Sequence, residues 1–173
     1  MKKLICLMAA LAMIFCFTAC GGSETPETQP NENNTPVAPA EPGFTFTYNG
    51  TEIALKAEAA PILAALGEPM SYTEETSCAF EGLDKTYYFG SFYLQTYPQG
   101  DKDYVFGFWF ADDSVSTAEG IYVGAPQAQV EAAYGADSYN GTNAYIMTKG
   151  ETKLTVILTD GVVSSIQYDA IFE

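Results

Sequence analysis

The chain has 173 residues, of which 22 are acidic and 7 are lysine, and its net charge is −15 with neither arginine nor histidine present. Nucleic-acid phosphates and anionic membrane surfaces repel such a polyanion, which excludes both as direct partners. The absence of histidine removes the usual general base and the usual nitrogen ligand of zinc. We therefore expect no metal, no cofactor and no catalytic activity.

The N-terminal segment has the pattern of a secretion signal. Two lysines precede an apolar run of 14 residues, Leu4 to Phe17, which is shorter than the roughly 20 that a membrane-spanning helix needs. The run ends in "FTAC", which resembles the lipobox of bacterial lipoproteins, with Phe17 where that family usually has leucine. The resemblance implies a signal peptide at residues 1–19 and an acyl group on Cys20. An ordinary secretory signal and a membrane anchor are the alternatives.

Residues 20–43 are predicted to be the lipidated cysteine followed by a disordered tether. The stretch is rich in Pro, Glu, Thr and Asn and has too few large apolar residues to form a core. Its root-mean-square reach is roughly 25 Å, from about 5–6 Å times the square root of its length. We expect a protein held by lipid on the extracytoplasmic side of the cell membrane, with a mature net charge of −17 from 5 lysines and 22 acids.

Composition changes at Phe44, since 22 of the 24 aromatic residues lie between Phe44 and the C-terminus. Apolar and polar residues alternate on both sides of Asn49-Gly50, a pair typical of two-residue hairpin turns. The sequence therefore predicts that a folded region begins here with a β-hairpin.

Two segments have similar residues at equivalent positions when they are aligned with an offset of 68 residues, and we call this shared pattern the repeated frame. "IALKAEAAPILAALG" covers residues 53–67 and "IYVGAPQAQVEAAYG" covers residues 121–135, with proline near the start and glycine at the end of each predicted helix. Strand-like runs follow both segments. The pattern predicts an α+β fold made of two repeats, residues 44–112 and 113–173, each a short helix plus an antiparallel β-meander, with the helices on one face of the sheet.

The repeated frame, above all "TAEGIYVGAPQAQVEAAYG", resembles the repeat of the β-lactamase inhibitor protein and the small lipoprotein of the β-barrel assembly machinery. It is also similar to uncharacterised two-repeat lipoproteins of Gram-positive bacteria. The resemblance implies a tandem repeat whose sheets form one curved surface that binds proteins. The chain departs from the inhibitor in having no disulfide pairs, and none of its binding-loop residues can be matched, so inhibition of a β-lactamase is not implied.

Few residues suggest chemistry. Cys78 remains alone once the signal is removed and Cys20 is acylated, and we expect it to be a small buried hydrophobe. The adjacent acids Glu74-Glu75 and Asp112-Asp113 would point to opposite sides of a strand. Paired carboxylates could still serve a glycan-active enzyme, which is the most distant alternative. No stretch has the spacing of a calcium loop.

Strand alternation predicts a binding face. We expect one face of the first repeat's strands to lie in the core, with Phe92, Leu94, Phe106, Phe108 and Phe110. The other face then carries Tyr93, Tyr97 and Trp109, and Gly107 leaves room beside Trp109 for a partner group. Polar residues take these places in the second repeat, where the expected core is Leu154, Val156, Leu158, Ile166 and Tyr168.

The asymmetry between the repeats favours a non-catalytic binding module for a protein, a peptide or an envelope polymer, with Tyr93, Tyr97 and Trp109 as contact residues. An assembly accessory of an envelope complex is the alternative function. The aromatic residues could instead pack on the N-terminal hairpin or form a ladder across the strands.

Overall fold

A computed structural model describes residues 42–172 of the chain. The predictions for the signal peptide, for Cys20 and for the tether up to residue 41 lie outside the described residues. No helix within residues 42–172 is long and apolar enough to span a membrane.

The described residues form nine strands, two α-helices and one 3₁₀ helix. In chain order these are β1 (Thr45–Tyr48), β2 (Thr51–Ala54), α1 (Ala59–Leu66), β3 (Ser71–Thr76), β4 (Leu83–Tyr88), β5 (Phe92–Gln99), β6 (Lys102–Phe110), α2 (Gln127–Tyr134), η1 (Ala136–Ser138), β7 (Ala144–Lys149), β8 (Thr152–Thr159) and β9 (Val162–Ala170).

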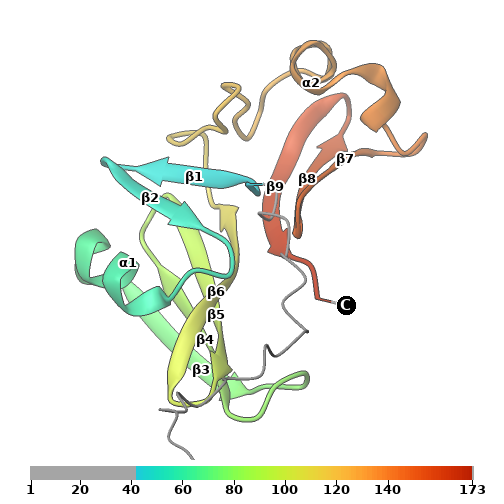
Figure 1. The fold of residues 1–173 in the computed structure, drawn as a ribbon. Coiled ribbons are helices and arrows are strands. Elements are labelled where there is room, and N and C mark those ends of the chain that lie inside the picture. The colour runs from blue at the N-terminus through green and yellow to red at the C-terminus, as the bar shows by residue number, and fades with distance from the viewer. Residues whose placement is uncertain (1–41, 173) are drawn as a thin grey trace, which may run out of the picture. The chain divides into compact units, whose positions relative to one another are not determined.

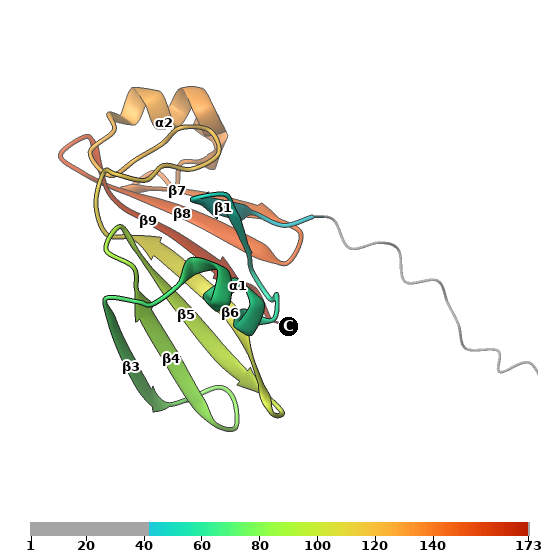
Figure 2. The ribbon, with the colours of Figure 1, turned by 90° about the vertical axis from the view of Figure 1, so that its left-hand side faces the viewer.

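Seven of the strands form one antiparallel sheet in the order β3-β4-β5-β6-β9-β8-β7 (Figure 1). The pairing of β6 with β9 joins the two halves of this sheet, and Phe108 pairs with Tyr168 at the middle of the three paired positions. Strands β1 and β2 make a separate two-stranded hairpin. Figure 2 shows α1 in front of β5 and β6, and α2 beside the ends of β7, β8 and β9.

The expected α+β fold of two helix-plus-meander repeats is wrong. The described residues are mostly β, with 48% strand and 15% helix, because each α-helix has only 8 residues while seven of the strands share a single sheet. The repeated frame also does not correspond to a full structural repeat, because equivalent positions lie in different secondary structure. Ile53 lies in β2, whereas its counterpart Ile121 lies in an irregular segment.

The hairpin is present where Asn49-Gly50 predicted it. Asn49 has φ 48° and Gly50 has φ 80°, the positive values that a two-residue turn of this type requires. The turn sets a register in which Phe46 pairs with Ile53, and both side chains are buried. The hairpin is therefore a part of the core rather than a loose N-terminal extension.

The two helix entries are locally equivalent. Before α1, the amide of Lys56 donates to the carbonyl of Val105 at 2.8 Å, and before α2, the amide of Gly124 donates to the carbonyl of Val163 at 2.7 Å. Each helix ends at the expected glycine, with φ 83° at Gly67 and a similar value at its counterpart in the other segment. The repeated frame thus encodes a common way to attach a short helix to a strand.

One hydrophobic core lies between the sheet and the elements on one of its faces. The hairpin and both helices contribute buried side chains to the same cluster as the sheet. Its members include Phe46, Ile53, Ile62, Phe92, Leu94, Phe108, Phe110, Val130, Leu154, Val156, Leu158, Ile166 and Tyr168. The core residues expected in β5, β8 and β9 are buried as predicted.

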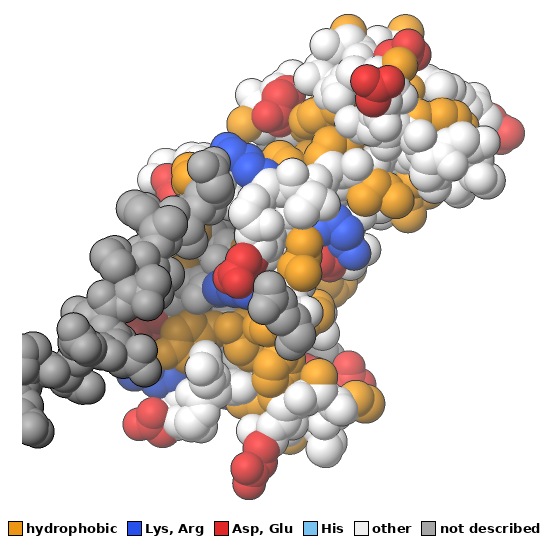
Figure 3. Space-filling view, turned by 45° about the vertical axis from the view of Figure 1, so that its right-hand side comes forward, with side chains coloured by type: hydrophobic (Ala, Val, Ile, Leu, Met, Phe, Trp, Pro, Cys, Tyr) orange, Lys and Arg blue, Asp and Glu red, His pale blue; other side chains and the backbone are white. Residues whose placement is uncertain are grey.

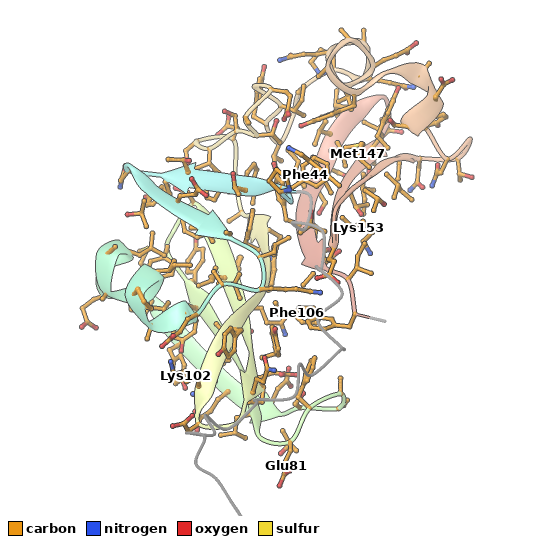
Figure 4. The ribbon with its side chains drawn as sticks, in the orientation of Figure 1. Phe44, Glu81, Lys102, Phe106, Met147 and Lys153 are labelled. Atoms are coloured by element: carbon orange, nitrogen blue, oxygen red, sulfur yellow. The ribbon has the colours of Figure 1, made fainter. Side chains whose placement is uncertain are left out.

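We call the opposite side of the sheet the open face. It carries Tyr88, Tyr93, Trp109, Gln167, Thr155 and Ile146, which pair in one row from β4 to β7. Figure 4 shows Phe106 and Lys153 on this side, away from α1.

Phe106 departs from the prediction that it belongs to the core with Phe108 and Phe110. The register of β5 and β6 shifts after Gln95, which pairs with Gly107, while the next residue, Thr96, pairs with Val105. Phe106 is the extra residue of this β-bulge, and it is only half-buried. The bulge turns its side chain to the open face, where it stacks on Phe172.

Candidate functional site

Three aromatic rings form a stacked ladder across neighbouring strands of the open face. Tyr88 and Tyr93 have ring centroids 4.4 Å apart and planes at 23°, and Tyr93 and Trp109 have centroids 5.0 Å apart and planes at 11°. The strand register places them directly opposite one another. All three residues are partly exposed. The structure therefore brings together two predicted contact residues and adds Tyr88.

Polar groups continue the row beyond Trp109. Gln167 pairs with Trp109 across β6 and β9, and its amide donates to Asp169 at 2.7 Å. The other carboxylate oxygen of Asp169 lies 3.3 Å from the ammonium group of Lys153. The ladder is thus bordered on the β9 side by a neutral set of mutually satisfied polar side chains.

Gly107 has a different role from the expected one. A Cβ atom at this position would lie 2.7 Å from the carbonyl oxygen of Tyr168, a distance that real side chains essentially never show. The absence of a side chain lets β6 and β9 approach each other. Gly107 does not leave room for a partner group, since Asp169 lies over it, with Oδ1 only 3.5 Å from the same Cβ position.

Tyr97 lies apart from the ladder, within a second aromatic group on the open face. It is only 5% exposed, with ring centroids 4.6 Å from Phe80 and 5.0 Å from Phe172. Burial raises the pKa of Tyr97 above its ordinary value. Tyr104 and Phe106 complete this group, which we call the aromatic cluster. Tyr97 therefore packs beneath the neighbouring aromatic rings and has little exposed surface for a partner to contact.

Sequence reasoning missed Tyr88, Phe80 and Phe172. Alternation along β4 places Tyr88 on the open face, but only the β4–β5 register shows that its ring meets Tyr93. Phe80 and Phe172 lie outside strands, so no alternation applied to them.

Figure 3 shows hydrophobic side chains gathered in the lower half of the surface that faces the viewer, with lysine and acidic groups among them.

The hollows near the turn between β5 and β6 are occupied by internal ion pairs. One of about 230 Å³ is lined by Lys85 and Asp103, whose charged atoms lie 2.6 Å apart, and this hydrogen bond raises the pKa of Lys85. A neighbouring hollow of about 240 Å³ contains the pair of Lys102 and Glu58 at 2.8 Å. These groups satisfy one another, so the hollows offer little to a ligand.

Other candidate chemistry is weak in the part of the chain that the structure describes. Cys78 is exposed in the loop between β3 and β4, so the expectation of a buried position is wrong. The loop sequence lies outside any strand, and alternation could not bury it. Residues 42–172 contain no group of three or more His, Cys, Asp and Glu side chains that could hold a metal ion.

Comparisons with protein-family models and with curated proteins gave no match. A comparison with solved structures found the crystal structure of an extracellular protein containing a SCP domain from Bacillus anthracis str. Ames, with a TM-score of 0.40 and 13% sequence identity. The match covers 67% of this chain and 44% of that chain, so it spans less than half the length of that protein. A likeness this distant carries no argument about function.

Proposed function

We propose that the protein is a lipid-anchored, non-catalytic binding module on the extracytoplasmic side of the cell membrane, and that the open face contacts its partner. The observation that supports this most is the partly exposed ladder of Tyr88, Tyr93 and Trp109. Tyrosine and tryptophan provide a large contact area with few rotatable bonds to immobilise, and they are enriched where binding energy is concentrated.

The stacking of the ladder favours a protein or peptide partner over a sugar polymer. A sugar ring packs best on the flat face of an aromatic ring, but here the faces of Tyr93 are covered by Tyr88 on one side and by Trp109 on the other. The exposed part of Tyr93 is therefore the edge of its ring. Ring edges are electropositive and suit backbone carbonyl groups and other aromatic rings of a protein surface.

The double substitution Trp109→Ala and Tyr93→Ala tests the site. The variant breaks both stacked pairs of the ladder, each of which contributes roughly 0.5–1.5 kcal/mol. It should therefore lose roughly 1–3 kcal/mol of unfolding free energy in total, against roughly 3–5 for each core aromatic residue that is truncated. Its binding to envelope proteins should fall sharply, as measured by cross-linking the full-length chain in membranes and quantifying the products. Urea unfolding gives the stability.

A matched control is Tyr72→Ala with Tyr122→Ala, two exposed aromatic residues that do not belong to the ladder. The control should keep the cross-linked products. If both double variants lose them equally, or if the ladder variant unfolds at room temperature, the open face is not the binding surface. A product that stays stoichiometric through purification would favour the role of an assembly accessory.

The lipid anchor has its own test. Cys20→Ser should prevent both acylation and lipoprotein-type cleavage. The variant should then either keep its signal segment or, if another site is cleaved, be released from membranes with a different N-terminus. Mass spectrometry of the wild-type chain should find an acyl group and a first residue at Cys20. A wild-type chain that carries no acyl group and keeps residues 1–19 would show that the segment is an anchor instead.

A further inference from the structure

Strand β3 forms one edge of the seven-stranded sheet (Figure 2). It pairs with β4 on one side, and none of the other described strands pairs with its outer side. All six of its residues are exposed, so no helix or loop within residues 42–172 covers it. The outer side of such a strand presents unpaired backbone N–H and C=O groups, which are a template for a strand of another chain.

The register shows which backbone groups of β3 point outward. The amide of Ser77, just after β3, donates to the carbonyl of Gly82 at 3.0 Å, and in an antiparallel ladder every second residue bonds to the same neighbour. The bond of 2.9 Å from the amide of Phe89 to the carbonyl of Phe92 agrees, because it assigns the odd-numbered residues of β4 to β5 and leaves the even-numbered ones to β3. Three residues of β3 therefore have backbone groups that point away from the sheet: Tyr72, Glu74 and Thr76.

The opposite edge of the sheet, β7, is partly covered. The outward-pointing amide of Ala144 donates to Oδ1 of Asn140 at 3.0 Å, and the carbonyl of Ala144 accepts from the amide of Asn140 at 2.8 Å. Strand β7 also ends in Lys149, and lysine is a residue with which natural edges resist pairing. Strand β3 has no lysine, proline or glycine, and its register with β4 runs without a shift. The fold thus protects one edge and leaves the other open.

The open edge is continuous with the ladder. Ser71 of β3 pairs with Tyr88, so a strand added to β3 would extend the ladder's row on the open face by one position. Strand addition uses backbone groups, which every residue but proline supplies in full. Truncating the side chain of Tyr72, as in the control for the ladder, should therefore leave the pairing in place.

Charge selects the occupant of this edge. Strand β3 carries Glu74 and Glu75 and no cation. A second copy of the chain would bring the glutamates of both edges and two net charges of −15 together, which disfavours self-pairing. A strand with lysine or arginine is favoured instead, because opposite charges on neighbouring strands stabilise a sheet.

We infer that the partner adds an extended segment that carries lysine or arginine to the outer side of β3. Its backbone pairs with the outward groups of Tyr72, Glu74 and Thr76, as in other cases in which a peptide joins the edge of a sheet. This inference rests on the proposed function and specifies how the partner is held.

The test uses the capped peptide KTVTVTK as the probe and the full-length chain in detergent, with amide hydrogen exchange followed by NMR. Without peptide, the three outward amides of β3 should exchange as solvent-exposed amides do, whereas those of Thr73 and Glu75 should be protected. Peptide at about ten times its dissociation constant should slow the three about tenfold, as mass action requires. The amide of Thr148, which points outward from β7 by the same rule, should not change.

Three variants separate strand pairing from charge. Glu74→Pro removes one outward amide and no bond to β4, so it should weaken peptide binding about tenfold and leave urea stability nearly unchanged. Glu74→Gln keeps the amide and should weaken binding only about twofold, since an exposed ion pair contributes little. Thr148→Pro makes the matched change on β7 and should leave the affinity unchanged.

Several results would overturn the inference. Protection of the outward amides in the free chain would show that the edge is already covered, by a second copy if light scattering finds a dimer. A peptide that leaves these amides unprotected would show that the edge does not accept a strand. Equal weakening by Glu74→Gln and Glu74→Pro would indicate attraction by charge alone. These results concern β3, whereas the proposed function is judged from the ladder variant and the cross-linked envelope proteins.

Discussion

Tyr72 shows how a single residue on the edge of the sheet responds to its neighbour. Its hydroxyl group donates a hydrogen bond of 2.6 Å to Oε2 of Glu74, two residues along β3 on the same side of the strand. This bond is the largest cause that raises the pKa of Tyr72 from 10.0 to about 12, followed by desolvation and by the charge of Glu74. A raised pKa favours the neutral phenol in the folded state.

The sign of the pH dependence follows from that shift. The stabilisation from the hydrogen bond is fully present below pH 10, the unfolded pKa, and is lost as the pH rises through about 12. We expect Glu74→Ala to move the pKa of Tyr72 back toward 10, as measured by tyrosinate absorbance in a difference titration against Tyr72→Phe. An unchanged pKa in Glu74→Ala would show that the hydrogen bond does not form in solution.

At the scale of elements, strand alternation predicted side-chain direction wherever the strand is regular. In β8 buried and half-buried residues alternate up to Leu158, and in β5 they do so up to Thr96, and the expected core residues of both strands are buried. In β6 the same reasoning placed Phe106 on the wrong face. A bulge adds one residue without changing the apolar pattern, and its one sequence signal was Gly107, which we interpreted as space for a ligand.

The candidate site was only partly predictable for a related reason. Alternation identified Tyr93 and Trp109 as residues of one face, which their stacking matches. Which strands are neighbours, and in what register, depends on contacts between distant parts of the chain, so the place of Tyr88 beside Tyr93 was not evident. Tyr97 was expected on the surface, but side chains from a loop and from the C-terminal residues cover it.

At the scale of the molecule, the repeated frame led to the wrong fold class. The frame correctly marked two short helices that end in glycine, but it said nothing about how the strands that follow them pair. The pairing of β6 with β9 joins both sets of strands into one sheet. The core crosses this joint, since Tyr168 of β9 packs against Phe108 and Phe110 of β6 and against Phe44 before the hairpin.

Truncation after Asp112 tests whether the halves depend on each other. The fragment keeps β1 to β6 but loses β9, so the paired edge of β6 and the buried ring of Phe108 would be exposed to water. An unpaired edge beside exposed aromatic residues favours aggregation. We therefore expect the fragment to be insoluble or to unfold without a cooperative transition. In the full-length chain, fluorescence of Trp109 and far-ultraviolet circular dichroism should report one coincident urea transition. A soluble fragment that melts cooperatively would show that residues 44–112 are an independent domain, because the core they share with β9 would then not be needed for folding.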